Sequence, residues 1–139
     1  MKILLINPPN FSSLNDNLYV NVHQAIGLAY LGAILEKHHY QVKILDALAE
    51  AFCQQTIKGN KKIIGLNKLQ IKKIIKNESP NLVGISMPFS YQASQAHSVA
   101  RLVKKINPNI IVVAGGVHPT ILPNLVMKDT NIDYVVRGE

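Results

Sequence analysis

The 139-residue chain has no tryptophan, a single cysteine and only 6% aromatic residues. Because Cys53 stands alone, the sequence excludes a disulfide framework and any cysteine-only metal or iron–sulfur site within these residues. The apolar run after Met1 is too short for a secretory signal or a membrane span. We therefore expect a soluble, cytoplasmic protein whose core is built from Val, Ile, Leu and Ala.

Common nucleotide-binding and catalytic motifs are missing as well. A dinucleotide fold needs G-x-G-x-x-G after its first strand, where this chain has Asn7-Pro8-Pro9. The P-loop, the acidic cluster of a phosphorylated receiver domain and the G-x-S-x-G turn of a serine hydrolase are also absent. These absences argue against the usual dinucleotide, nucleoside triphosphatase, receiver and hydrolase classes.

Positive charge exceeds negative charge, and the formal net charge is +7 at pH 7. Seven lysines fall in one segment without aromatic residues: Lys58, Lys61, Lys62, Lys68, Lys72, Lys73 and Lys76. No nucleic-acid motif accompanies them, so we expect neither nucleic acid nor a membrane as a partner. We interpret the segment as the solvated face of one helix, with a docking surface for an acidic partner or another domain as the alternative.

The apolar pattern predicts strands and helices in alternation. The expected strands are residues 2–6, 41–46, 82–86, 110–114 and 132–136. The expected helices are residues 24–38, 67–76, 90–106 and 121–127, with Asn67 as the N-cap of the second. Residues 10–22 are expected to form a polar loop, and residues 47–60 are ambiguous between helix and loop.

This alternation predicts an α/β fold of the flavodoxin-like or Rossmann-like class. Its doubly wound parallel sheet would have five strands in the order 2-1-3-4-5. The length fits one domain over residues 1–139. Because no helix follows the fifth strand to cover it, we expect this domain to be an N-terminal piece of a longer enzyme.

Three turns are expected at the carboxyl edge of neighbouring strands, where open α/β sheets bind ligands. They are Asn7-Pro8-Pro9, the turn from Ser86 through Met87 to Ser90, and the turn from Gly115-Gly116 to Thr120. The adjacent glycines let a ligand approach bare backbone, and Gly84 removes a side chain inside the third strand. Together these residues predict a slot of small and hydroxyl side chains, suited to a flat group on a phosphodiester tail.

These residues resemble a known family. The first strand with its proline turn, Ile26-Gly27-Leu28-Ala29-Tyr30-Leu31, the third strand, Gly115-Gly116-Val117-His118-Pro119-Thr120 and Val135-Val136-Arg137-Gly138-Glu139 appear in the family's order and spacing. The family is the cobalamin-binding domain that precedes the radical S-adenosylmethionine core of B12-dependent radical enzymes. The resemblance implies a domain that buries the nucleotide tail of cobalamin and holds the corrin over the carboxyl edge of the strands.

The resemblance also implies a role for each part of the slot. Ser86 and Ser90 match hydroxyl positions that contact the buried tail, and Gly115 and Gly116 match the glycine pair that the tail passes. Residues 117–120 match the loop beside the corrin, and the proline turn would border its other side. The expected cofactor-binding residues are Asn7, Pro8, Pro9, Gly84, Ser86, Met87, Ser90, Gly115, Gly116, Val117, His118, Pro119 and Thr120.

A protein ligand to cobalt is a separate question. Better-known cobalamin domains carry D-x-H-x-x-G, whereas this chain has Asn21-Val22-His23-Gln24-Ala25-Ile26-Gly27. The acid that would orient the imidazole is lost, so we interpret His23 as a loop residue and only a weak candidate for cobalt. His118 is better placed to reach the cofactor, through a hydrogen bond to a corrin amide. His38, His39 and His97 are expected at exposed helix positions.

The cysteine triad that would hold a [4Fe–4S] cluster is absent from this chain. We therefore expect this domain to bind cobalamin without completing a reaction. S-adenosylmethionine and the iron–sulfur cluster would belong to a downstream domain of a methyltransferase or cyclase. The alternative is a flavodoxin-like ligand-binding or protein-interaction domain without cobalamin, whose basic segment serves as a docking face. A small independent hydrolase or transferase ranks last.

Overall fold

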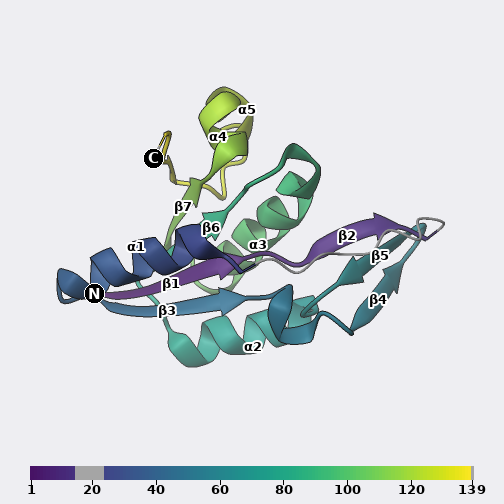
Figure 1. The fold of residues 1–139 in the computed structure, drawn as a ribbon, viewed down its shortest axis with the longest axis horizontal. Helices are drawn as coiled ribbons and strands as arrows, with labels where there is room; N and C mark the ends of the chain where they lie inside the picture. Colours follow the sequence, from purple (N-terminus) through teal and green to yellow (C-terminus); the bar gives the residue numbers. More distant parts are fainter. Residues whose placement is uncertain (15–23, 139) are drawn as a thin grey trace.

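The computed structural model of the chain describes residues 1–14 and 24–138. Its centre is a five-stranded parallel sheet (Figure 1). The strands are β1 (Lys2–Asn7), β3 (Gln41–Asp46), β6 (Leu82–Ser86), β7 (Ile111–Gly115) and β8 (Tyr134–Val135). They lie in the order β3-β1-β6-β7-β8. Counted along the chain within this sheet, that is the predicted order 2-1-3-4-5; only the labels differ, because three further strands form a second sheet.

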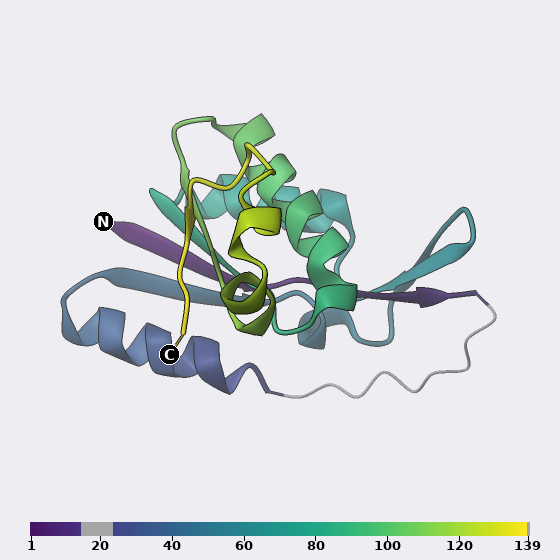
Figure 2. The same ribbon diagram turned by 90° about the horizontal axis from the view of Figure 1, so that it is seen from above.

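Helices cover the two faces of the sheet unequally. Helix α1 (Ile26–Lys37) lies on one face, and α2 (Lys68–Glu78) and α3 (Ala93–Ile106) lie on the other (Figure 2). The main core lies on the α2–α3 face, where alternate residues of the strands are fully buried. The core beneath α1 is small and contains Ile3, Leu5 and Leu28. None of the helices in the described residues is long and apolar enough to cross a membrane.

The two helices of the well-covered face follow directly from the sequence. Asn67 caps α2 by accepting hydrogen bonds from the backbone of Leu69 and Gln70, while the Gln70 side chain accepts from the backbone of Asn67. This reciprocal arrangement is a capping box. Helix α3 buries a stripe at helical spacing: Ala93, Ala96, Val99, Ala100 and Val103.

A second, antiparallel sheet contradicts two of the sequence-based expectations. Strands β2 (Asn10–Ser13), β5 (Lys61–Ile64) and β4 (Gln55–Lys58) lie in the order β2-β5-β4. Residues 10–13 are therefore not loop, and residues 47–60 contain a 3₁₀ turn, η1 (Ala49–Ala51), followed by strand β4. The hairpin reverses at Gly59, whose φ of +59° suits glycine. Pairing with β5 turns the otherwise polar β2 into a strand.

This second sheet also corrects the interpretation of the lysine-rich segment. Lys58 lies in β4, and Lys61 and Lys62 lie in β5, whereas Lys68 and the later lysines lie in α2. The segment is therefore a hairpin followed by a helix. The prediction of a single helix face was wrong.

The elements after β6 differ in detail from their predicted bounds. A 3₁₀ turn, η2 (Ser90–Gln92), precedes α3. After β7 the chain enters α4 (Val117–Ile121) at once, and then α5 (Pro123–Val126). The short helix expected at residues 121–127 thus begins earlier and is divided at Leu122, since a proline at a helix's first position starts a new helix. Residues 117–120, expected as a loop, are helical.

Candidate functional site

One strip of the main sheet has no helix over it in the described residues. Helix α1 packs over β1 and β3, and the residues of β6 and β7 that point to the same side stay partly exposed. They include Gly84, Ser86, Val113 and Gly115. The two strands pair so that Gly84 is opposite Val113 and Ser86 is opposite Gly115. We call these four residues, with Val136 beside Gly115, the open face.

At the carboxyl end of the open face, backbone hydrogen bonds join the residue after β6 to the end of β7. The Met87 amide donates to the carbonyl of Gly115 at 2.8 Å, and the His118 amide donates to the carbonyl of Met87 at 3.1 Å. Gly116 has a φ of +116°, and a Cβ on it would lie 2.9 Å from the Met87 carbonyl oxygen. Both facts require glycine at position 116, because a side chain would be strained and would overlap the neighbouring backbone.

The other two glycines of the predicted slot have different surroundings. A Cβ at Gly84 would lie 2.8 Å from the Leu5 Cδ2 atom, so this glycine makes room for a core leucine. A Cβ at Gly115 would meet only the Cβ of Val136, at 4.0 Å. Gly115 is therefore open on the side that faces away from the main core, where a ligand can approach the sheet. Ser86 has no hydrogen-bond partner for its hydroxyl among the described residues, which leaves that group free for a ligand.

Ser90 and His118 form a second polar group at this edge. The Ser90 hydroxyl and the His118 Nδ1 atom lie 2.8 Å apart, from η2 and α4 respectively. His118 is buried, and this burial, together with the charge of His97, lowers the pKa of its imidazole. Because the neutral imidazole is favoured, His118 can pair with the hydroxyl as either donor or acceptor, depending on its tautomer. Its Nδ1 atom is occupied by Ser90, and the predicted contact with a corrin amide would need its other nitrogen.

The sequence predicted an exposed position for His97, and this prediction was wrong. Its Nδ1 atom lies 2.7 Å from Asp129, and both side chains are largely buried. Burial raises the pKa of Asp129, but hydrogen bonds from Asn131 and His97 outweigh it, so the pKa is lowered overall. This pair joins α3 to the turn after α5.

The remaining residues of the glycine turn are placed as follows. The Thr120 hydroxyl donates to the Gly116 carbonyl at 2.8 Å and accepts from the Gly138 amide at 3.1 Å. Thr120 therefore ties the chain after β8 to the turn. Val117 is exposed, whereas Pro119 is buried against the core.

The proline turn and Met87 lie away from the open face. The Asn7 side-chain amide donates a hydrogen bond to the Asp46 carboxylate at 2.9 Å, and Pro8 and Pro9 are buried. Pro9 lines a cavity on the α2–α3 face, and the Met87 side chain lies fully inside the main core. The structure thus brings together Gly84, Ser86 and Gly115, and separately Ser90 and His118. The ligand contacts of residues 7–9 and of Met87 stay predictions.

Val136 borders the open face, although the sequence predicted no contact with the ligand for it beyond its place in the 135–139 motif. Its position beside Gly115 follows from the pairing of β7 with β8, which starts at Val113 opposite Tyr134. The alternation of the last strand carries the signal, since Tyr134 and Val136 point to one side and Val135 to the other. His23 lies outside the described residues. Within the described residues, no three His, Cys, Asp or Glu side chains gather as a metal site.

Comparison with known families shows what this arrangement belongs to. Residues 17–139 match the B12 binding domain family. The chain is a B12-binding domain. The match covers most of the chain, including every element from α1 onward, and it confirms the resemblance seen in the sequence. Cobalamin is accordingly the cofactor of this B12-binding domain.

Three longer proteins are similar to the domain over its whole length. It is 36% identical to cytidylyl-2-hydroxyethylphosphonate methyltransferase of Streptomyces wedmorensis, covering 99% of this chain and 26% of that protein. It is 39% identical to an uncharacterised methyltransferase of Pyrococcus horikoshii, covering 100% and 27%. It is 30% identical to the anaerobic magnesium-protoporphyrin IX monomethyl ester cyclase of Rubrivivax gelatinosus, covering 100% and 22%. The chain thus spans about a quarter of the length of these relatives.

Among solved structures, the response regulator TrrA of Thermotoga maritima has the same fold. The TM-score is 0.58 at 11% identity, and the match covers 99% of this chain and 86% of that one. The likeness confirms the flavodoxin-like fold and carries no function, because the sequence lacks the receiver's acidic cluster.

The residues of the B12-binding domain fit its cofactor. A planar base on a phosphate-bearing tail needs small residues along its path and hydroxyls or amides near the phosphate. Gly115 offers an open path, Ser86 offers an unpaired hydroxyl, and Gly116 lets two strand ends meet without a side chain between them.

Proposed function

We propose that this domain is the cobalamin-binding module of a longer B12-dependent radical S-adenosylmethionine enzyme that transfers a methyl group. The observation that carries the proposal is the open face, where Ser86 and Gly115 lie opposite each other at the carboxyl edge of the sheet. The family match supports cobalamin as the ligand. The two methyltransferases, at 36% and 39% identity, are more similar to the domain than the cyclase at 30%, and this difference supports methyl transfer over cyclisation.

In this proposal the chain's own residues bind and orient. Ser86 donates a hydrogen bond to the tail, and the bare backbone at Gly115 lets the base lie against β7. Backbone hydrogen bonds from Met87 to Gly115 and from His118 to Met87 hold the two strand ends together at this edge of the sheet. Bound cobalamin would supply a cobalt centre that carries the methyl group.

The first test of this proposal is cobalamin retention. The protein is mixed with hydroxocobalamin and desalted, and its visible spectrum is recorded. We expect corrin absorbance to remain with the natural chain and to be lost from Gly115→Asp, which fills the path and repels the phosphate. Position 115 has room for a Cβ, so the folded state should survive the change.

The matched control is Asn77→Asp, which adds the same negative charge at an exposed position of α2, on the opposite face of the sheet from the open face. It should retain cobalamin. Equal retention by Gly115→Asp and the natural chain would contradict the assigned site. Absence of corrin absorbance in the natural chain would contradict cobalamin binding by the domain alone.

Two further observations test the finer parts of the proposal. A spectrum unchanged by His23→Ala would support a cobalt without a histidine ligand, and an altered spectrum would overturn that expectation. Reading the coding sequence beyond residue 139 for C-x-x-x-C-x-x-C would test the radical S-adenosylmethionine assignment, because that triad holds the required cluster.

A further inference from the structure

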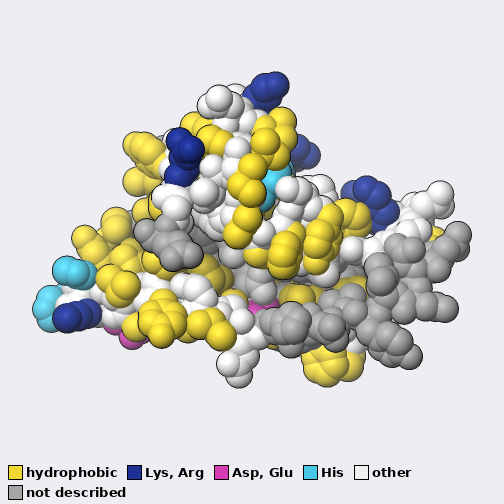
Figure 3. Space-filling view, turned by 45° about the horizontal axis from the view of Figure 1, so that its top comes forward, with side chains coloured by type: hydrophobic (Ala, Val, Ile, Leu, Met, Phe, Trp, Pro, Cys, Tyr) yellow, Lys and Arg dark blue, Asp and Glu magenta, His cyan; other side chains and the backbone are white. Residues whose placement is uncertain are grey.

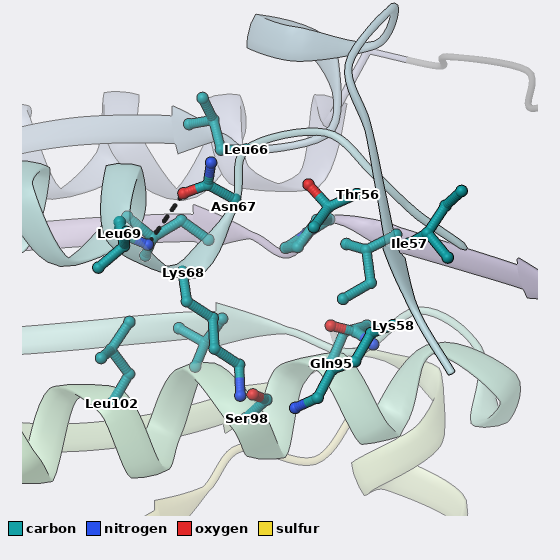
Figure 4. A pocket seen from close by; sticks show the side chains of 14 residues that line it. Thr56, Ile57, Lys58, Leu66, Asn67, Lys68, Leu69, Gln95, Ser98 and Leu102 are labelled. Atoms are coloured by element: carbon teal, nitrogen blue, oxygen red, sulfur yellow. Dashed lines mark hydrogen bonds between the residues drawn. The ribbon is translucent and has the colours of Figure 1, made fainter. Parts of the chain in front are cut away.

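The cavity that Pro9 lines lies on the opposite side of the sheet from the open face. It is bounded by the β4–β5 hairpin, the start of α2 and the middle of α3, and it has a volume of about 340 Å³ (Figure 4). Cavities of this size hold small organic ligands. No part of the proposed cobalamin site except Pro9 contributes to it.

Most of this cavity is apolar. Its floor is formed by buried side chains of the main core, among them Leu66, Ile71 and Val99. Its rim carries Ile57 of β4 and Leu69 of α2, which are 69% and 77% exposed. Exposed aliphatic side chains beside an apolar floor lose water contact when an apolar group fills the space, which stabilises the bound state.

One end of the cavity is polar and positively charged. Lys58 of β4, Lys68 of α2, and Gln95 and Ser98 of α3 all line it. Figure 4 shows the Lys68 side chain pointing from α2 toward Ser98. None of these four side chains has a hydrogen-bond or ion-pair partner among the described residues, so their donors are available to a ligand.

The charge at this end is not balanced by the protein. The ion pairs of the described residues involve Lys2, Lys43, His97 and Lys104, all elsewhere. Burial, followed by the positive charges of Lys58, Arg101 and Lys105, lowers the pKa of Lys68. An anion bound here would relieve the repulsion among these cations.

We propose that this cavity binds an amphipathic organic anion, with its carboxylate or phosphate between Lys58 and Lys68 and its apolar body against Leu66 and Val99. The charged end selects an anion, and the apolar floor selects a ligand with a hydrocarbon or aromatic part. This site is independent of the cobalamin site, because α2 and α3 cover the other face of the sheet.

Octanoate is a suitable probe, with octanol, octyltrimethylammonium and inorganic phosphate as comparison ligands. Calorimetry measures affinity, and amide chemical shifts in heteronuclear NMR locate the site. We expect octanoate to bind more tightly than all three comparison ligands. The largest shifts should fall at the start of α2 and around Ser98. Equal binding of octanol would contradict the role of the lysines, and equal binding of inorganic phosphate would contradict the role of the apolar floor.

Variants distinguish this cavity from general surface charge. Lys68→Met keeps an unbranched apolar side chain, one atom shorter, but removes a charge-assisted hydrogen bond, so it should weaken octanoate binding by about tenfold. Lys58→Met tests the same contact from the hairpin. The matched control is Lys72→Met, which removes an equal charge from an exposed position of α2 outside the cavity.

The control should leave octanoate affinity unchanged. A similar loss in Lys72→Met and Lys68→Met would overturn the proposal, as would octanoate-induced shifts centred on α1 instead of α2 and α3. Cobalamin retention should be the same in all three lysine variants, so failure at this cavity is distinguishable from failure of the proposed function.

Discussion

At the scale of single residues, the adjacent glycines Gly115 and Gly116 are needed for different reasons. Gly116 combines a φ of +116° with a Met87 carbonyl 2.9 Å from the position of a Cβ. We expect Gly116→Ala to lower the free energy of unfolding by about 1–3 kcal/mol or more, since strain and overlap both act. Chemical denaturation measures this. Gly27→Ala, at an open position inside α1, should instead be neutral or stabilising.

The sequence predicted that a ligand approaches the backbone at the glycine pair, but it could not show that Gly116 alone is required by the neighbouring backbone. That requirement comes from Met87, which lies 29 positions earlier, after β6. Likewise, the sequence named both Ser90 and His118, but nothing in their spacing indicates that the two side chains meet at 2.8 Å. Contacts between distant segments require the fold.

His118 leads to a prediction about pH. Burial lowers its pKa in the folded state, so the folded protein disfavours the charged imidazole. The resulting stabilisation is complete above the ordinary histidine pKa of about 6.5 and is lost as the pH falls through the lower folded-state value. The natural chain should therefore lose more unfolding free energy than His118→Gln between about pH 7 and about pH 5. Parallel curves for the two proteins would contradict this.

At the scale of elements, the capping box of α2 is a local signal that the sequence predicted well. Asn67 satisfies two backbone amides at the start of the helix, and Gln70 also exchanges hydrogen bonds of 2.9 and 3.0 Å with Gln54. We expect Asn67→Ala to cost about 1 kcal/mol of unfolding free energy. Lys73→Ala, on the exposed side of the same helix, is the control and should change stability little.

The β4–β5 hairpin shows where element prediction failed. The Gly59-Asn60 turn between two short β-favouring runs was a usable hairpin signal. The lysines around it favoured a helical interpretation because their spacing beyond residue 67 is helical. Strand β2 carried no such signal, since Asn10 and Ser12 are buried by pairing with Ile64 and Lys62 of β5, far along the chain. Tertiary pairing, not local propensity, makes it a strand.

Asp133 joins elements that are far apart in the sequence. Its carboxylate accepts from the Lys104 side chain and from the Val112 amide, both at 2.7 Å. Burial raises its pKa, but these two hydrogen bonds outweigh that effect and the pKa is lowered. Asp133→Asn should cost about 1–3 kcal/mol at neutral pH. The cost should shrink as the pH falls through the lowered pKa, which denaturation at several pH values will measure.

At the scale of the whole molecule, the predicted alternation of strands and helices was enough to give the order of the main sheet, although it missed the three strands of the second sheet. It was not enough to predict the unequal cover of the two faces. Hydrophobic side chains remain exposed along α1, including Tyr30 at 71% and Ile34 at 54%, and others gather around α4 and α5 (Figure 3). Which part of the sheet stays uncovered depends on which strands each helix packs against, and α1 packs against β1 and β3 instead of β6.

This asymmetry predicts an order of local opening. Helix α3 buries five side chains in the main core, whereas α1 buries only Leu28 and Gly32. Because local opening costs less where fewer apolar contacts are lost, the amides of α1 should exchange with solvent faster than those of α3. Native-state hydrogen exchange with mass spectrometry will measure both. Protection of α1 equal to that of α3 would show that the small core beneath α1 is as cooperative as the main core. If cobalamin lies on the open face, its addition should slow exchange in β6 and β7 while leaving β4 and β5 unchanged.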